Sequence, residues 1–206
     1  EFRIGTFGTA DFFDINPVGS DSHLQFMNWT VDNNGAYDYA ADTRGYTWGF
    51  IAEYQSKAIG VRFGEMLMPK VANGINLDWN LRRSRAENME LELHTTAILQ
   101  RQDVLRFLAY VNHANMGDYR DAIVRFQAGV DPVPTIENTR QEGRIKYGFV
   151  INDKQELTNT LRLFARFGWN EGGHDSCAYT EGHSTLQFGV DLGWRRGAGH
   201  WGKVGR

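Results

Sequence analysis

The sequence predicts an all-β protein, an antiparallel up-and-down β-barrel that crosses a membrane. Three observations carry this prediction. Apolar side chains alternate with small or polar ones over segments of roughly ten residues, the length of tilted strand that crosses a bilayer. Short and long connections alternate between these segments. The polar side of each segment is rich in glycine and arginine rather than in the lysine, glutamate and threonine of an ordinary solvated sheet.

The alternation is clearest in the stretch GYTWGFIAEYQSKAIGVRFGEMLMP, which runs from residue 45 to residue 69. Every even position from Tyr46 to Tyr54 carries an apolar side chain. After a polar break at 55–57, the apolar side chains stand at odd positions such as Val61 and Phe63. Successive strand side chains point to opposite faces, so this pattern predicts a hairpin with one apolar face.

The same period of two predicts eight strands, and the connections indicate how these strands are arranged. The expected strands are 2–8, 45–54, 58–67, 88–99, 103–112, 143–152, 158–169 and 184–194. Tight turns are expected at 55–57, 100–102 and 153–157, and long connections at 9–44, 69–87, 113–142 and 170–183. An antiparallel meander then has all its long connections at one end, as in outer-membrane barrels with short periplasmic turns and long extracellular loops.

One long connection contains a helical pattern. Between Gly117 and Gly129, the side chains of Tyr119, Ile123 and Phe126 recur at helical spacing, so a short helix is expected there. The chain contains no repeat, linker or low-complexity tract, which predicts a single domain over 1–206.

The pattern alone leaves two environments open for the apolar face. In a membrane barrel this face meets lipid, whereas in a soluble β-sandwich that binds glycans through its long loops it is buried between two sheets. Phe63, Phe107, Phe149 and Leu163 would face lipid in the first case and a closed core in the second. Aromatic side chains near strand ends favour the barrel, because membrane girdles require them: Tyr46, Tyr54, Trp169 and Trp194.

Composition excludes several other classes. The 206 residues carry 22 basic and 25 acidic side chains, a net charge of -3 that implies no nucleic-acid partner. No apolar run reaches the length of a membrane helix. The single cysteine, Cys177, excludes an internal disulfide framework and gives no zinc motif.

Several stretches together resemble the carbohydrate-selective porins (OprB-type) of Gram-negative outer membranes. They include GTADFFDINPVGSDSHLQFMNWTVDNNGAYDYAADTRGYTWG (8–49), RFGEMLMPKVANG (62–74), NHANMGDYRDA (112–122), LFARFGWNEG (163–172) and AYTEGHSTLQFGVDLG (178–193). The resemblance implies a barrel of sixteen strands in the outer membrane that lets mono- or oligosaccharides diffuse through, with outer-membrane lipid around it, a possible homo-oligomer, and neither cofactor nor chemistry. The eight strands would then be half of a barrel, and the chain a fragment cut at both ends.

A diffusive pore selects by its lining and its narrowest ring. On the polar face, arginine and carboxylate groups could bind sugar hydroxyls and aromatic rings could stack on the sugar. The alternative for each charged side chain is that it only solvates the lumen and braces its neighbours. The expected lining residues are Arg62, Arg106, Arg144, Lys146, Arg162, Arg166, Glu53, Glu65, Glu90, Glu92, Asp191 and Tyr110.

The segment AYDYAADTRG (36–45) has two interpretations of equal weight. It folds inward to constrict the pore, or it forms a capped turn at the start of a strand. The residues that would form the constriction are Tyr37, Tyr39, Asp42 and Arg44.

Metal and enzyme sites are weakly indicated. Glu90, Glu92 and His94 share one strand face, but neighbours two residues apart lie about 7 Å from each other along a strand, too far for all three to reach one ion easily. His183 and Ser184 could be the pair of a barrel-shaped lipid hydrolase, although adjacent strand residues point to opposite faces. No metal, cofactor or enzymatic activity is therefore expected.

Overall fold

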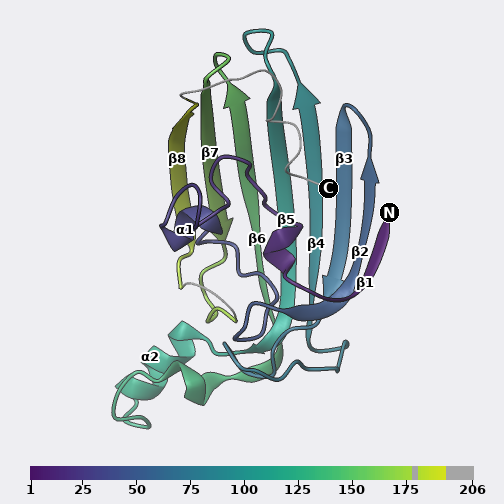
Figure 1. The fold of residues 1–206 in the computed structure, drawn as a ribbon. Coiled ribbons are helices and arrows are strands. Elements are labelled where there is room, and N and C mark those ends of the chain that lie inside the picture. Colours follow the sequence, from purple (N-terminus) through teal and green to yellow (C-terminus); the bar gives the residue numbers. More distant parts are fainter. Residues whose placement is uncertain (178–180, 194–206) are drawn as a thin grey trace.

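The structure, a computed structural model, describes residues 1–177 and 181–193, and eight antiparallel strands in them form one curved sheet (Figure 1). The strands follow one another in the sheet in chain order. They are β1 (Phe2–Phe7), β2 (Thr47–Gln55), β3 (Ile59–Met66), β4 (Arg85–Thr95), β5 (Asp103–Met116), β6 (Gln141–Glu156), β7 (Leu161–Asn170) and β8 (Ser184–Leu192). The helical elements are η1 (Thr9–Asp11), α1 (Trp29–Asp32), α2 (Tyr119–Gln127) and η2 (Ile136–Thr139).

The predicted up-and-down meander of eight strands is confirmed. Figure 1 has the short turns at the top of the sheet and the long connections, including α2, at the bottom. Among the described strands, β1 and β8 each pair with one neighbour, so these eight strands are not closed into a ring. The expected helix in 117–129 is present as α2, whose first turn is capped by the Asp118 side chain, which accepts from the Asp121 N–H at 2.9 Å.

Two expected turns lie elsewhere. The polar run 153–157 is not a turn, because β6 continues to Glu156 and pairs Lys154 with Phe164 and Glu156 with Arg162 of β7. The hairpin between β4 and β5 spans 96–102 rather than 100–102. At the end of a barrel strand both faces become polar, so a polar run there cannot distinguish strand from turn.

The two faces of the sheet differ as the alternation predicts. Phe107, Phe149 and Phe188 are 39%, 40% and 81% exposed on the convex face, whereas inward positions such as Asn152 and Arg166 are each 1% exposed. The alternative of a β-sandwich is therefore wrong, because the described residues form one sheet whose apolar face is uncovered. Trp194, expected in the aromatic girdle, lies outside the described residues.

None of the helices in the described residues is long and apolar enough to span a bilayer.

The inner face is covered by the connection between β1 and β2, residues 8–46, which is called the inner loop below. It crosses in front of the sheet and carries η1 and α1 (Figure 1). Phe13, Tyr37 and Ala40 of this loop form a buried cluster with Ile51, Leu108 and other inward side chains of the strands. The apolar core of the described chain therefore lies between the sheet and its own loop.

Glycines at inward strand positions give the inner loop room. A Cβ at Gly168 would lie 2.3 Å from Asn34 Oδ1, and one at Gly64 would lie 2.9 Å from the Phe13 ring. Any side chain at these two positions would push the loop away from the sheet.

Candidate functional site

The inner face carries a chain of ion pairs from neighbouring strands. Arg62 on β3 bridges two carboxylates: its Nη2 lies 2.5 Å from Glu53 Oε1 on β2, and its Nη1 lies 2.7 Å from Glu90 Oε1 on β4. The pairing register explains this, because Arg62 stands opposite both residues in the sheet. Arg62 Nη1 also donates to the carbonyl oxygen of Phe12 in the inner loop at 2.6 Å.

A second ion pair lies one step further along the sheet. Arg106 Nε on β5 donates to Glu92 Oε2 on β4 at 2.7 Å, and Glu92 Oε1 lies 2.5 Å from His94 Nε2. Because Glu90 and Glu92 are each paired with an arginine, they do not converge with His94 on a common point. No group of three metal-ligating side chains occurs in residues 1–177 and 181–193.

A cavity of about 930 Å³ opens between the inner loop and strands β1 to β5. Its wall carries Arg3, Arg62 and Arg106 together with Glu53, Glu92 and further acidic side chains. The Phe12 ring forms part of the wall and has the Arg3 guanidinium 4.8 Å from its centroid. Arg106 Nη1 is buried and has no hydrogen-bond acceptor among the described residues.

The inner loop contains the expected constriction residues, and the structure places them in two groups. Tyr37 is buried and its hydroxyl accepts from Asn88 Nδ2 at 2.7 Å, while the Tyr39 ring packs 5.8 Å from that of Tyr37. Burial raises the pKa of Tyr39 to about 12 and raises the pKa of Tyr37 well above its ordinary value. Both rings therefore stay neutral over the physiological pH range.

Asp42 and Arg44 instead form the turn that leads into β2. Asp42 Oδ1 accepts from the backbone N–H groups of Arg44 and Tyr46 at 2.8 and 3.2 Å, and Asp42 Oδ2 pairs with Arg44 Nη2 at 2.5 Å. Burial raises the pKa of Asp42, but these hydrogen bonds outweigh it and the pKa is lowered overall. The Arg44 side chain is 63% exposed. This geometry is that of a capped turn.

The other expected lining residues also lie on the inner face, with one exception. Arg144 reaches Asp118 and Asp121 of the long connection that carries α2, and Lys146 Nζ donates to Ser176 Oγ at 2.9 Å, so these two side chains brace the long-loop end of the sheet. Arg162 pairs with Asp191 of β8. Tyr110 donates from its hydroxyl to the carbonyl oxygen of Ala36 in the inner loop at 2.8 Å.

Glu65 is the exception to the expected lining. The inward positions of β3 are those of Gly60, Arg62, Gly64 and Met66, so Glu65 stands on the outer face beside Phe63. Its carboxylate therefore lies on the opposite side of the sheet from the other expected lining residues.

Sequence reasoning missed the polar residues that hold the inner loop. Asn152 on β6 donates to Asp14 Oδ1 at 2.6 Å and accepts from Asn16 Nδ2 at 2.7 Å. Asn112 and Asn170 donate to the carbonyl oxygens of Asp38 and Ala36. Inward glycines such as Gly64 and Gly168 were the available signal, because a glycine inside a strand marks the close approach of another backbone.

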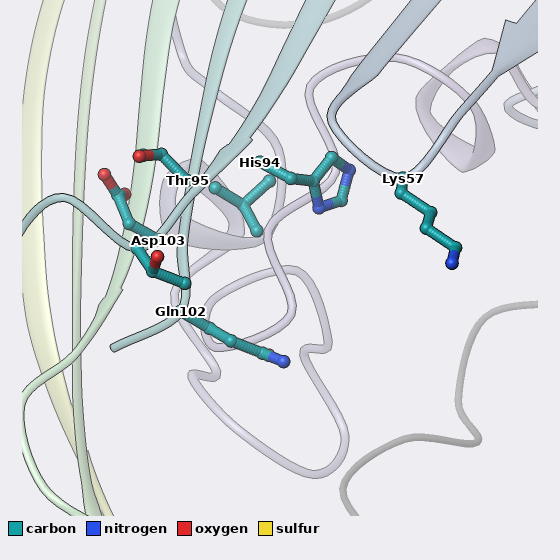
Figure 2. Close-up of a pocket in the computed structure, with 7 residues that line it drawn as sticks. Lys57, His94, Thr95, Gln102 and Asp103 are labelled. Carbon is teal, nitrogen blue, oxygen red and sulfur yellow. The ribbon is translucent and has the colours of Figure 1, made fainter. Parts of the chain in front are cut away.

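A smaller cavity of about 280 Å³ lies at the short-turn end of the sheet (Figure 2). Lys57 comes from the turn between β2 and β3, and His94 and Thr95 come from the end of β4. Gln102 ends the hairpin between β4 and β5, and Asp103 begins β5. In Figure 2 the Lys57 side chain extends away from His94. These side chains do not converge on a common point, so this cavity lacks the arrangement of a binding site.

The candidate hydrolase pair lies at the start of β8. Ser184 Oγ and His183 Nε2 are 3.4 Å apart, so the two side chains do meet, because His183 precedes the strand. Both residues are exposed. In the described part of the chain no carboxylate is hydrogen-bonded to His183, and the pair therefore lacks the group that would orient a catalytic base.

Comparison with known proteins agrees with this geometry. Residues 1–193 match the family described as carbohydrate-selective porin, OprB family. Searches of curated proteins and of solved structures found no match. The family match covers nearly the whole chain and fits an up-and-down sheet with an exposed apolar face and a charged inner face. The chain belongs to the carbohydrate-selective porins of the OprB family, which are proteins of the Gram-negative outer membrane.

Proposed function

We propose that this chain forms the wall of a water-filled pore through which sugars diffuse passively, with no chemical step. The apolar outer face meets lipid, and the inner face with its loop forms the pore lining. The observation that carries this proposal is the cavity of about 930 Å³, whose wall combines arginine and carboxylate side chains with an aromatic ring.

The charge balance of this cavity favours neutral, hydroxyl-rich solutes. Arg62 is paired with Glu53 and Glu90, and Arg106 with Glu92, so the lining presents many hydrogen-bonding groups without a dominant charge. A cation or an anion would meet repulsion and attraction at short range, whereas a sugar can donate to the carboxylates and accept from the guanidinium groups.

Liposome swelling tests the proposal. Vesicles containing the full-length porin should swell faster in glucose than in an amino acid or an organic acid of similar size. Arg106→Gln removes a charged donor from the cavity wall and leaves Glu92 with His94. We expect the preference for sugar to fall about tenfold or more, since one hydrogen bond to a charged group contributes about 1.5–3 kcal/mol.

The control is Arg83→Gln. Arg83 lies 2.9 Å from Glu142 in an exposed ion pair, with its side chain 62% exposed, and this variant should behave like the wild type. Equal swelling rates for all solutes in every protein would show a general pore and refute sugar selectivity.

A further inference from the structure

Asp14 of the inner loop is held by three different strands. Its N–H donates to Glu90 Oε2 on β4 at 2.7 Å, its carbonyl oxygen accepts from Arg166 Nη2 on β7 at 2.8 Å, and its Oδ1 accepts from Asn152 Nδ2 on β6 at 2.6 Å. The backbone φ of Asp14 is 57°, a left-handed conformation that few non-glycine residues adopt. These contacts therefore keep the loop in a conformation that it would not hold by itself.

Arg166 joins two distant parts of the inner loop. Besides Asp14, its guanidinium donates to the Ser20 hydroxyl, and on the other side its Nη1 donates to the carbonyl oxygen of Val31 at 2.7 Å and to that of Asp32 at 3.3 Å. The Arg166 side chain is fully buried. One guanidinium thus fastens the segment 14–20 and the segment 31–32 to the same point of β7.

Arg62 also contacts the inner loop, at the carbonyl oxygen of Phe12, but Arg166 binds two separate segments of it. Arg62 and Arg106 form part of the wall of the large cavity, whereas the donors of Arg166 face the loop backbone and its Nε lies 3.6 Å from Asp14 Oδ1. Planar, bidentate donors bound to carbonyl oxygens are rigid, and a lysine could not reproduce their geometry. An arginine with these contacts fixes the conformation of the loop and has no donor directed at a solute in the cavity.

We propose that Arg166 is a positioning residue: it fastens the inner loop across the inner face and so sets the largest sugar that the pore admits. This inference rests on the proposed function, since the width of a pore matters only if solutes pass through it. Arg166 would then change the size limit for sugars while the lining around Arg106 stays intact.

Loop release can be measured without any transport, because Cys177 is a built-in probe. This only cysteine of the sequence is 1% exposed and packs in the same buried cluster as Tyr37 and Ala40 of the inner loop. Its backbone N–H donates to Asp38 Oδ1 of that loop at 2.9 Å. Detaching the loop should expose the thiol to a water-soluble maleimide.

The experiment compares the full-length porin with Arg166→Gln, Arg166→Lys and Lys154→Gln. We expect maleimide to label Cys177 about tenfold faster or more in Arg166→Gln, because several charge-assisted hydrogen bonds are lost together. Arg166→Lys should label at an intermediate rate. Lys154 is an inward cation that pairs with Glu156 of its own strand at 3.2 Å, and Lys154→Gln should label like the wild type.

Vesicle swelling in raffinose and in glucose gives the second readout. The ratio of the raffinose rate to the glucose rate should rise in Arg166→Gln and not in Lys154→Gln. If Arg166→Gln fails to fold, Ser20→Ala removes one partner of Arg166 from the loop side and should raise the labelling rate about threefold or more.

The outcomes separate the two proposals. Faster labelling with a raised raffinose ratio supports both of them. Unchanged labelling in every Arg166 and Ser20 variant overturns the positioning role, whatever the swelling rates are. Faster labelling in vesicles that admit no sugar supports the positioning of the loop by Arg166 and refutes the pore.

Discussion

Replacing Arg62 with methionine is expected to destabilise the folded porin by about 3–5 kcal/mol, the cost of leaving a buried charge without its partner. Arg62 bridges Glu53 and Glu90, and the Glu90 side chain is 1% exposed. Without the guanidinium, these two carboxylates lie on the same face with no cation between them. The free energy of unfolding, measured by urea titration of the full-length porin in vesicles, checks this prediction.

Two further variants show whether the loss comes from the buried charge. Arg62→Met combined with Glu90→Gln should recover much of the stability, because the carboxylate that remains unpaired, Glu53, is the more exposed of the two. Arg83→Met breaks an exposed ion pair with Glu142 and should cost less than about 1 kcal/mol. Equal losses in Arg62→Met and Arg83→Met would contradict a buried, interdependent network on the inner face.

Replacing Phe149 with arginine is expected to cost about 2–4 kcal/mol, as for a charge at the lipid-facing midpoint of a barrel strand. Phe149 lies in the middle of β6, is 40% exposed on the outer face, and has the rings of Phe167 and Trp169 6.0 and 5.8 Å away. In water an exposed arginine would cost little at this position. The free energy of folding from urea into lipid vesicles measures the difference.

Depth in the membrane provides the control for this prediction. Ile59 begins β3 beside the short turn and is 43% exposed on the same face, so Ile59→Arg should cost only about 0–1 kcal/mol. Phe149→Leu removes the ring without adding a charge and measures the loss of ring packing alone. Costs that do not depend on depth would show that the outer face is not in contact with lipid.

The strands and their faces could be predicted from the sequence because a sheet with one apolar side imposes a period of two on every strand. Phe107 and Phe149 follow that period, and their outward orientation agrees with it. Polar runs break the signal, and for that reason the sequence predicts a turn at 153–157, where β6 in fact continues to Glu156. Glu65 stands at an outward position, and its charge makes that position look inward in the sequence.

The docking of the inner loop could not be predicted from a period, because it depends on contacts between residues that are far apart in the chain. Asn16 and Asn152, which are hydrogen-bonded, are 136 positions apart. The groups involved are amides, a hydroxyl and backbone carbonyl oxygens, which occur equally in unstructured loops. As a result, the sequence predicts Arg166 as a lining residue but does not predict its partners in the loop.

Single-channel conductance in a planar bilayer tests the central claim most directly. The full-length porin should open in discrete steps, with weak preference between cations and anions because the lining charges are paired, and added oligosaccharide should reduce the current in proportion to its occupancy of the pore. Arg106→Gln should weaken that block without changing the step size by much. Conductance steps that no sugar affects, or no steps at all from a folded protein, would contradict a sugar pore lined by this inner face.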